Sequence, residues 1–173
     1  MEKMDIIQKG NIKLVKINTE NIDDIINLSV DEKQKEYITS NIYSIAEAYA
    51  TISEGRIAMP FGIYNGNIPL GFIMIGFDYY NKKIKKVPYF IENNYMIWRF
   101  MIDKNYQNKG IGKEALRIAL DYIHTFPFGK AKYCWLSYEP ENKAAKALYS
   151  SFGFEERSDY YVEGGEMPAT LRL

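Results

Sequence analysis

The sequence has very little of the residue types that most often hold metals or form covalent intermediates. It contains one cysteine, Cys134, and one histidine, His124. A single cysteine excludes an intrachain disulfide and a cysteine-rich zinc site. A single histidine argues against a histidine-ligated metal centre. We therefore expect no metal and no nucleophilic triad, with Cys134 serving for packing and His124 for structure.

An excess of charge of one sign is also missing. The 22 lysines and arginines balance the 22 aspartates and glutamates, and no block of like charge stands out. Without a basic surplus, the sequence predicts neither a nucleic-acid partner nor binding to a membrane surface.

No apolar run has the composition of a membrane helix. Ile57–Phe77 is uncharged over about the length that spans a bilayer, but its prolines, glycines and asparagines predict turns between strands. Met1–Gly10 lacks the apolar core of a signal peptide. We expect a cytoplasmic protein, with the 173 residues (1–173) forming a single domain of ordinary size.

The residue patterns that are present predict a mixed α/β fold in the order β-α-α-β-β-β-α-β-α-β-β. Strands are predicted at Ile12–Ile17, Ala58–Tyr64, Ile68–Phe77, Tyr95–Ile102 and Tyr133–Ser137, with two more in Phe154–Leu173 around Gly164-Gly165. Asn65-Gly66 predicts a hairpin turn, since both residues accept positive φ. Asp78–Asn94 is a polar excursion before the strand at Tyr95. Alternation in that strand places Trp98, Phe100 and Ile102 on one face and Ile97, Arg99 and Met101 on the other.

Four helices are predicted between these strands. Thr19 is the expected N-cap of the first, and Ser44–Ser53 forms the second. The third follows a glycine loop and ends before Pro127 and Gly129; its apolar face is Ala115, Leu116, Ala119, Leu120 and Ile123. Asn142 caps the fourth, and Gly153 lies where a helix-terminating glycine belongs.

The glycine loop Gln107–Gly112 precedes the third helix and predicts an anion site. The first turn of a helix leaves amide N–H groups unpaired, and the helix dipole adds partial positive charge. Gly110 and Gly112 let a phosphate approach the backbone, and Lys109 and Lys113 add charge nearby. The same glycines also fit an ordinary strand-to-helix turn.

Two other phosphate motifs fit less well. Gly110–Ala115 matches the loose dinucleotide pattern G-x-G-x-x-A, but that motif needs a βαβ unit near the start of a domain. Here it follows at least four strands, two of them in a hairpin. A P-loop would need Gly at position 107 and Ser or Thr at 114, where the chain has Gln107 and Glu114.

A second motif lies downstream of the loop, with a strand between the two. Asn142–Phe154 is an Asn-capped helix that carries Tyr149 and ends in Phe152-Gly153-Phe154. Together with Gln107–Gly112, which satisfies [Q/R]-x-x-G-x-[G/A], it resembles the GNAT superfamily of acetyl-CoA-dependent N-acetyltransferases. Arg99–Asp103, Leu136–Asn142 and Gln34–Ala48 resemble the bacterial spermine/spermidine (diamine) acetyltransferases within it.

The resemblance implies a parallel pair of strands, Tyr95–Ile102 and Tyr133–Ser137, that splay apart to admit acetyl-CoA, with no metal. The acetyl-CoA-binding residues that it implies are Phe100, Met101, Ile102, Gln107, Asn108, Lys109, Gly110, Ile111, Gly112, Lys113, Asn142, Lys143, Ala145 and Tyr149. Tyr149 is the implied general acid; without the motif, a tyrosine packed between helix and sheet is the simpler interpretation. The implied substrate-binding residues are Glu36, Tyr37, Trp135 and Ser137.

Several points stay open at this level. The general base is one of Glu36, Asp78, Glu139 or Glu141, with Glu36 ranked first, or a water. Arg99 is expected to face away from a polycation or to pair with an acid. The acceptor is a small amine, a polyamine in the first instance, with a protein N-terminus or an antibiotic amine as alternatives. A non-catalytic acyl-CoA sensor is the alternative from another class. The family also makes a homodimer an expectation by analogy.

Overall fold

The computed structural model describes residues 9–78 and 87–173, and within them the predicted element order is confirmed. Seven strands form one sheet in the order β1-β2-β3-β4-β5-β7-β6. Their bounds are β1 (Ile12–Lys16), β2 (Ile57–Asn65), β3 (Ile68–Phe77), β4 (Tyr95–Ile102), β5 (Tyr133–Tyr138), β6 (Glu155–Glu156) and β7 (Met167–Arg172). Neighbouring strands are antiparallel except for β4 and β5, which are parallel.

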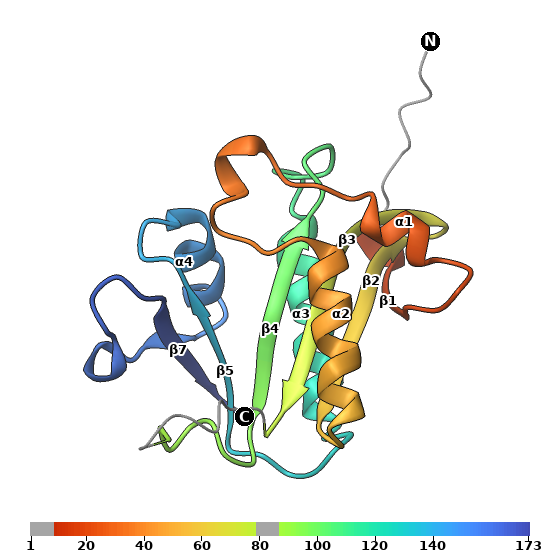
Figure 1. Cartoon of the computed structure of the whole chain (residues 1–173). Coiled ribbons are helices and arrows are strands. Elements are labelled where there is room, and N and C mark those ends of the chain that lie inside the picture. The colour runs from red at the N-terminus through yellow and green to blue at the C-terminus, as the bar shows by residue number, and fades with distance from the viewer. Residues whose placement is uncertain (1–8, 79–86) are drawn as a thin grey trace.

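Four α-helices cover the two faces of the sheet (Figure 1). Their bounds are α1 (Ile22–Ile26), α2 (Asn41–Ser53), α3 (Ile111–His124) and α4 (Lys143–Ser150), with 3-10 turns η1 (Lys9–Asn11), η2 (Glu32–Gln34) and η3 (Ser158–Tyr160). The main core packs α3 and α4 against one face. A second core, which includes Ile25 of α1 and Ala48 of α2, lies on the other face. The result is a helix–sheet–helix sandwich.

The starts of the first two helices differ from the prediction. Thr19 is not the N-cap of α1; the helix begins at Ile22 after Asn21. The Asn18 side chain accepts the N–H of Glu20 at 2.8 Å and forms a local turn that delays the helix. Helix α2 begins at Asn41 rather than Ser44, because the hydroxyl of Ser40 accepts the N–H of Tyr43 and caps it.

The turns between strands lie at or next to their predicted positions. The predicted hairpin joins β2 to β3, but its two-residue turn is Gly66-Asn67, one residue later than predicted. Asn65 ends β2 and pairs with Ile68, and of the two predicted turn residues only Gly66 has a positive φ, at 59°. In the tail, β6 and β7 pair antiparallel and flank Gly164-Gly165 as expected. Of the predicted excursion Asp78–Asn94, residues 79–86 lie outside the described part of the chain.

A β-bulge in β4 makes the simple alternation wrong for this strand. Arg99 pairs with Met74 and Ile97 with Ile75, so Trp98 is the extra residue. The inserted residue reverses the faces on either side of it. Ile97 therefore shares the main core with Phe100 and Ile102, and Trp98 packs with Met101 on the α2 side.

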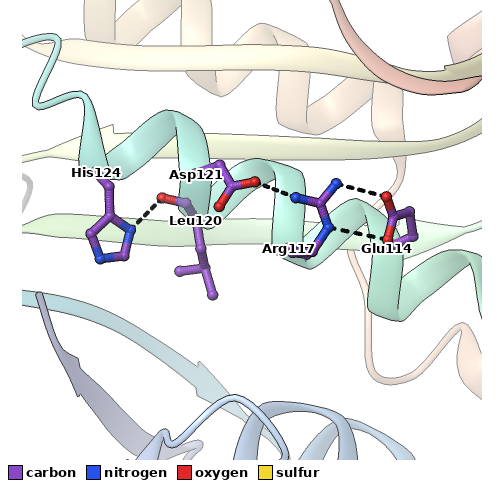
Figure 2. A network of polar contacts seen from close by, with 5 residues as sticks. All are labelled: Glu114, Arg117, Leu120, Asp121 and His124. Atoms are coloured by element: carbon purple, nitrogen blue, oxygen red, sulfur yellow. Dashed lines mark hydrogen bonds and ion pairs between the residues drawn. The ribbon is translucent and has the colours of Figure 1, made fainter. Parts of the chain in front are cut away.

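Charged side chains interact with one another along one face of helix α3 (Figure 2). Arg117 bonds Glu114 at 2.7 Å and also pairs with Asp121 one turn on. His124, at the last position of the helix, lies with its Nδ1 2.7 Å from the carbonyl of Leu120. These contacts are helix-surface interactions. No helix in the described residues is long and apolar enough to cross a membrane.

Candidate active site

The parallel strands β4 and β5 are paired only at one end. Tyr95 pairs with Cys134 and Met96 with Trp135, and the pairing of the two described strands goes no further. On its other edge β4 stays paired with β3 from Tyr95 to Ile102. The strands diverge beyond Met96, toward the end where the connection between α1 and α2 crosses the sheet (Figure 1). The edge of β4 that faces β5 is thereby left available for hydrogen bonding.

A cavity of about 450 Å³ lies where the strands diverge. Its walls come from the end of β4, the glycine loop, the start of α3, helix α4 and the α1–α2 connection. Of the acetyl-CoA residues implied by the sequence, those in its lining are Phe100, Met101, Ile102, Gln107, Asn108, Gly110, Gly112, Lys113, Asn142, Ala145 and Tyr149. The fold therefore gathers most of the predicted site, from five separate segments, around one space.

The start of α3 has the geometry of an anion site. Gly110 is its N-cap with a φ of 76°, and no side chain caps the helix. Asn108 also has positive φ, at 60°. The first-turn amides therefore have no partner within the helix, and no capping side chain takes their place. Gly112 keeps a Cβ out of the cavity wall.

Gln107 fixes the loop by bridging two other segments. Its amide nitrogen donates to the carbonyl of Ile102 at 2.9 Å and to the Gln34 side chain at 2.8 Å. The first bond ties the loop to the end of β4, and the second ties it to η2. The glutamine of the motif thus determines where the helix start lies relative to the strand edge.

Helix α4 is held at both ends, and Tyr149 lies in its last turn. Asn142 accepts the N–H of Ala145 at 3.0 Å as the N-cap. At the other end, Phe154 N–H donates to the Tyr149 carbonyl and Gly153 N–H to that of Ser150, with Gly153 at a φ of 86°. This is a Schellman motif, which confirms Gly153 as the terminating glycine.

The Tyr149 ring packs between Tyr138 of β5 and Phe154, and the residue is 8% exposed. Its hydroxyl has no hydrogen-bond partner in the described part of the chain, and the residue lines the cavity. Burial raises the pKa of the phenol. Smaller contributions in the same direction come from three neighbours: Tyr138, Cys134 and Glu166. The phenol is therefore protonated throughout the physiological range.

Comparison with known proteins agrees with this geometry. The family model for the acetyltransferase (GNAT) family matches residues 22–154. The chain belongs to the GNAT acetyltransferases. It is 31% identical to the spermine/spermidine N(1)-acetyltransferase of Bacillus subtilis over 157 residues, which cover 89% of this chain and 94% of that protein.

Solved structures share the fold. An aminoglycoside acetyltransferase in complex with coenzyme A superposes with a TM-score of 0.73 at 12% identity, covering 93% of this chain and 94% of that one. The spermidine N-acetyltransferase of Vibrio cholerae, in complex with CoA and spermine, has a TM-score of 0.63 at 16% identity, with 95% of each chain covered. The chain is an acetyl-CoA-dependent N-acetyltransferase.

The cavity of this GNAT chain fits acetyl-CoA as its co-substrate. The start of α3 offers amides to the pyrophosphate, and Lys113 adds a cation in the lining. The free edge of β4 offers backbone groups to the amide-containing pantetheine arm. In the described residues no group of three or more His, Cys, Asp or Glu side chains is arranged to hold a metal ion.

Two carboxylates also line this cavity. Tyr37 lines it from the α1–α2 connection, Glu139 from the residue after β5, and Glu166 from the residue before β7. Partial burial raises the pKa of Tyr37, and carboxylates raise it further in the order Glu36, Glu141 and Glu139. Glu36, Glu139 and Glu141, whose carboxylates act on the Tyr37 phenol, form what we call the Tyr37 carboxylate cluster.

Arg99, the one cation in strand β4, forms an ion pair. Its guanidinium donates to Glu47 of α2 at 2.8 Å and to the carbonyl of Trp98 at 3.0 Å. It also lies over the Trp98 ring, 5.5 Å from the centroid. The expectation that Arg99 pairs with an acid is confirmed, although the residue does line the cavity.

Six predicted site residues do not contribute to the cavity lining: Lys109, Ile111, Lys143, Glu36, Trp135 and Ser137. The Lys109 side chain turns back to the Asn105 carbonyl at 2.9 Å. Ile111 is buried in the core, which leaves only its backbone near the loop, and Lys143 is exposed. Trp135 packs with Phe90 and Met96. Ser137 reaches the site indirectly, through a hydrogen bond to Glu166.

The sequence patterns did not single out Tyr138 and Glu166, both of which line the cavity. Tyr138 donates to Glu156 at 2.8 Å. The signal for Tyr138 was its place next to Ser137 at the open end of β5. Glu166 had no motif around it, because only the pairing of β7 with β5 brings it to the site. Cys134 is fully buried, where burial raises the pKa of its thiol, and it serves packing as expected.

Proposed function

We propose that this enzyme acetylates a polyamine such as spermidine or spermine, with Tyr149 as the acid that protonates the leaving sulfur. The observation that supports it best is that one cavity is lined by groups suited to both substrates. The uncapped start of α3 and Lys113 can attract the phosphates of the donor, and Glu139 and Glu166, with the other carboxylates around Tyr37, can attract a polycation. The relative from Bacillus subtilis, named as a spermine/spermidine acetyltransferase, supports the same substrate class.

The donor site would hold acetyl-CoA through backbone groups. Amides from Asn108 to Lys113 bind the pyrophosphate, and the edge of β4 at Phe100, Met101 and Ile102 pairs with the pantetheine arm. An amide near Phe100 or Met101 polarises the thioester carbonyl. A preorganised donor of this kind typically contributes about 3 kcal/mol to transition-state stabilisation.

The chemistry needs a neutral amine and a protonated leaving group. The amine nitrogen forms the new C–N bond as the C–S bond breaks, and the sulfur takes the Tyr149 proton. The starting ammonium gives up two protons in all. One returns to Tyr149, and the other is released to solvent, so the products are an amide, a thiol and one proton.

The carboxylates explain why a polycation is the fitting substrate. A polyamine places further ammonium groups several bonds from the reacting nitrogen. Tyr37 and Glu139 line the cavity, and the Tyr37 carboxylate cluster supplies negative charge there, while Arg99 of β4 is paired with Glu47. The balanced net charge of the chain is compatible with this, since only the local field matters.

The test is an acceptor panel read by release of free thiol from acetyl-CoA. We expect spermidine and spermine to be acetylated with kcat/KM at least about tenfold above hexylamine, which has one ammonium. A peptide with a free N-terminus and an aminoglycoside complete the panel. Preference for either of these over the polyamines would overturn the polyamine proposal.

A charge-removing variant tests the cluster itself. Glu139→Gln should raise KM for spermidine about fivefold to tenfold and leave KM for hexylamine within about twofold, because only spermidine carries a distal ammonium. The matched control is Glu92→Gln. Glu92 is an exposed glutamate that lies just before the first residue of β4, Tyr95. Equal effects of Glu139→Gln on both amines would contradict the assignment.

A further inference from the structure

The two faces of the β4–β5 gap carry different residues, because side chains alternate along β5. Cys134, Leu136 and Tyr138 belong to the main core on the α3 and α4 side. Trp135 belongs to the cluster with Phe90 and Met96, against which Trp98 also packs. Since Trp98 lies on the α2 side, Trp135 and Ser137 face that side as well. Tyr149 comes from α4 and lies on the opposite side.

Glu166 is held on the α2 side by pairing and by a hydrogen bond. Pro168 of β7 pairs with Ser137, so Glu166, two residues earlier, is the diagonal neighbour of Ser137 on the same face. The Ser137 hydroxyl donates to the Glu166 carboxylate. A turn in which the N–H of Gly165 bonds the Val162 carbonyl at 2.9 Å, with Gly164 at a φ of 77°, returns the chain to this point.

Glu166 and Tyr149 face the same space. Both line the cavity, and the charge of Glu166 acts on the Tyr149 phenol from the other face of the gap. One carboxylate oxygen of Glu166 accepts the hydrogen bond from Ser137. The other oxygen is available to a ligand, because Glu166 is exposed. A thioester in the gap therefore has a phenol on one side and a carboxylate on the other.

We propose that Glu166 binds the reacting nitrogen of the acceptor amine and directs it onto the thioester from the face opposite Tyr149. This role rests on the proposed function and adds a specific residue to it. The Tyr37 carboxylate cluster takes the distal ammonium groups, whereas Glu166 takes the nitrogen that forms the new bond. Ser137 is a positioning residue that orients the carboxylate.

The roles predict different kinetic signatures for the two groups of carboxylates. Glu166→Gln keeps the size of the side chain and a carbonyl for Ser137, but it removes the charge. We expect kcat/KM to fall about 10-fold to 100-fold for every amine, hexylamine and spermidine alike, with KM for acetyl-CoA within about twofold. Ser137→Ala should give a smaller fall in the same direction, since the carboxylate remains but is no longer oriented.

Glu163→Gln is the matched control, because Glu163 is an exposed glutamate of the same loop that does not line the cavity. A calorimetric titration of spermidine into the enzyme saturated with CoA gives a readout without turnover, and Glu166→Gln should weaken it about tenfold. Amine kinetics within twofold of wild type for Glu166→Gln would overturn the role. An effect confined to polyamines would overturn it too.

The role of Glu166 and the polyamine proposal can fail independently of each other. Where wild-type enzyme prefers another amine of the panel, the polyamine proposal fails, and the comparison of Glu166→Gln with Glu163→Gln on that amine still tests Glu166. If the wild-type enzyme prefers polyamines and Glu166→Gln has wild-type amine kinetics, only the role proposed for Glu166 fails.

Discussion

At the scale of single residues, the proposed chemistry depends on how the surroundings of Tyr149 change the pKa of its phenol. A phenol with an ordinary pKa of about 10 gives its proton to a thiolate at a modest uphill cost. Burial raises the pKa further in this protein, so in the proposed mechanism the phenol would act first as a hydrogen-bond donor to the developing thiolate. Proton transfer would be completed as the C–S bond breaks.

Replacing Tyr149 by Phe should lower kcat about 100-fold, with KM for acetyl-CoA within about twofold, because the ring packing against Tyr138 and Phe154 is kept. The raised pKa means that the acid form persists as pH rises. Wild-type kcat should therefore increase with pH as the amine deprotonates and show no loss assignable to Tyr149 up to about pH 10. Thiol release followed across pH 6–10 measures both, and an unchanged kcat in the variant would remove the role.

At the scale of elements, the glycine loop and α3 are proposed as the anion site because the helix begins without a side-chain cap. Gly112 differs from Gly110 in an informative way. Gly110 has positive φ, whereas a Cβ at Gly112 would make only ordinary contacts, 3.7 Å from Ile102 and 3.9 Å from Leu148. The protein alone tolerates an alanine at position 112. A phosphate that lies against this part of the cavity wall, however, would be too close to a Cβ at position 112.

Gly112→Ala should accordingly leave the melting temperature unchanged or slightly raised, because alanine has the higher helix propensity. Binding of acetyl-CoA should weaken at least about tenfold, as measured by calorimetry. Gly66→Ala is the control: its φ of 59° makes alanine cost about 1 kcal/mol of stability, while the hairpin turn lies outside the cavity lining. Retention of wild-type affinity in Gly112→Ala would contradict close approach of the phosphate.

At the scale of the whole molecule, we propose that donor and acceptor meet in one strand gap. The α3 and α4 layer would supply the anion site and the acid, and the α2 side would supply the Glu166 carboxylate. Such an arrangement favours direct transfer in a complex of enzyme and both substrates. The one cysteine offers no covalent route, since Cys134 is fully buried and packed in the main core.

Initial-velocity plots should therefore give intersecting lines, not the parallel lines of a ping-pong mechanism. Cys134→Ala should keep kcat within about threefold of wild type, while costing about 1 kcal/mol of stability through lost packing. Denaturation and steady-state kinetics on the same preparation measure the two effects. Parallel lines together with an inactive variant would point to a covalent acetyl intermediate and overturn direct transfer.

The sequence by itself determined the order of elements, the hairpin between the second and third strands and the two motifs that predict the donor site. These are local patterns, since hydrophobic period, turn residues and caps act over a few neighbouring residues. It also indicated Tyr149, but only by resemblance. The start of α1 was missed because the turn made by Asn18 competes with the Thr19 cap.

The tertiary structure alone decided the rest. The bulge at Trp98 changes which β4 residues face each layer, and no local pattern marks it. Only pairing between β5 and β7 brings Glu166 next to Ser137, across 29 residues of chain. The gap in which we propose that donor and acceptor meet follows from where β4 and β5 stop pairing. Such long-range contacts depend on how the layers pack, and sequence period does not encode that.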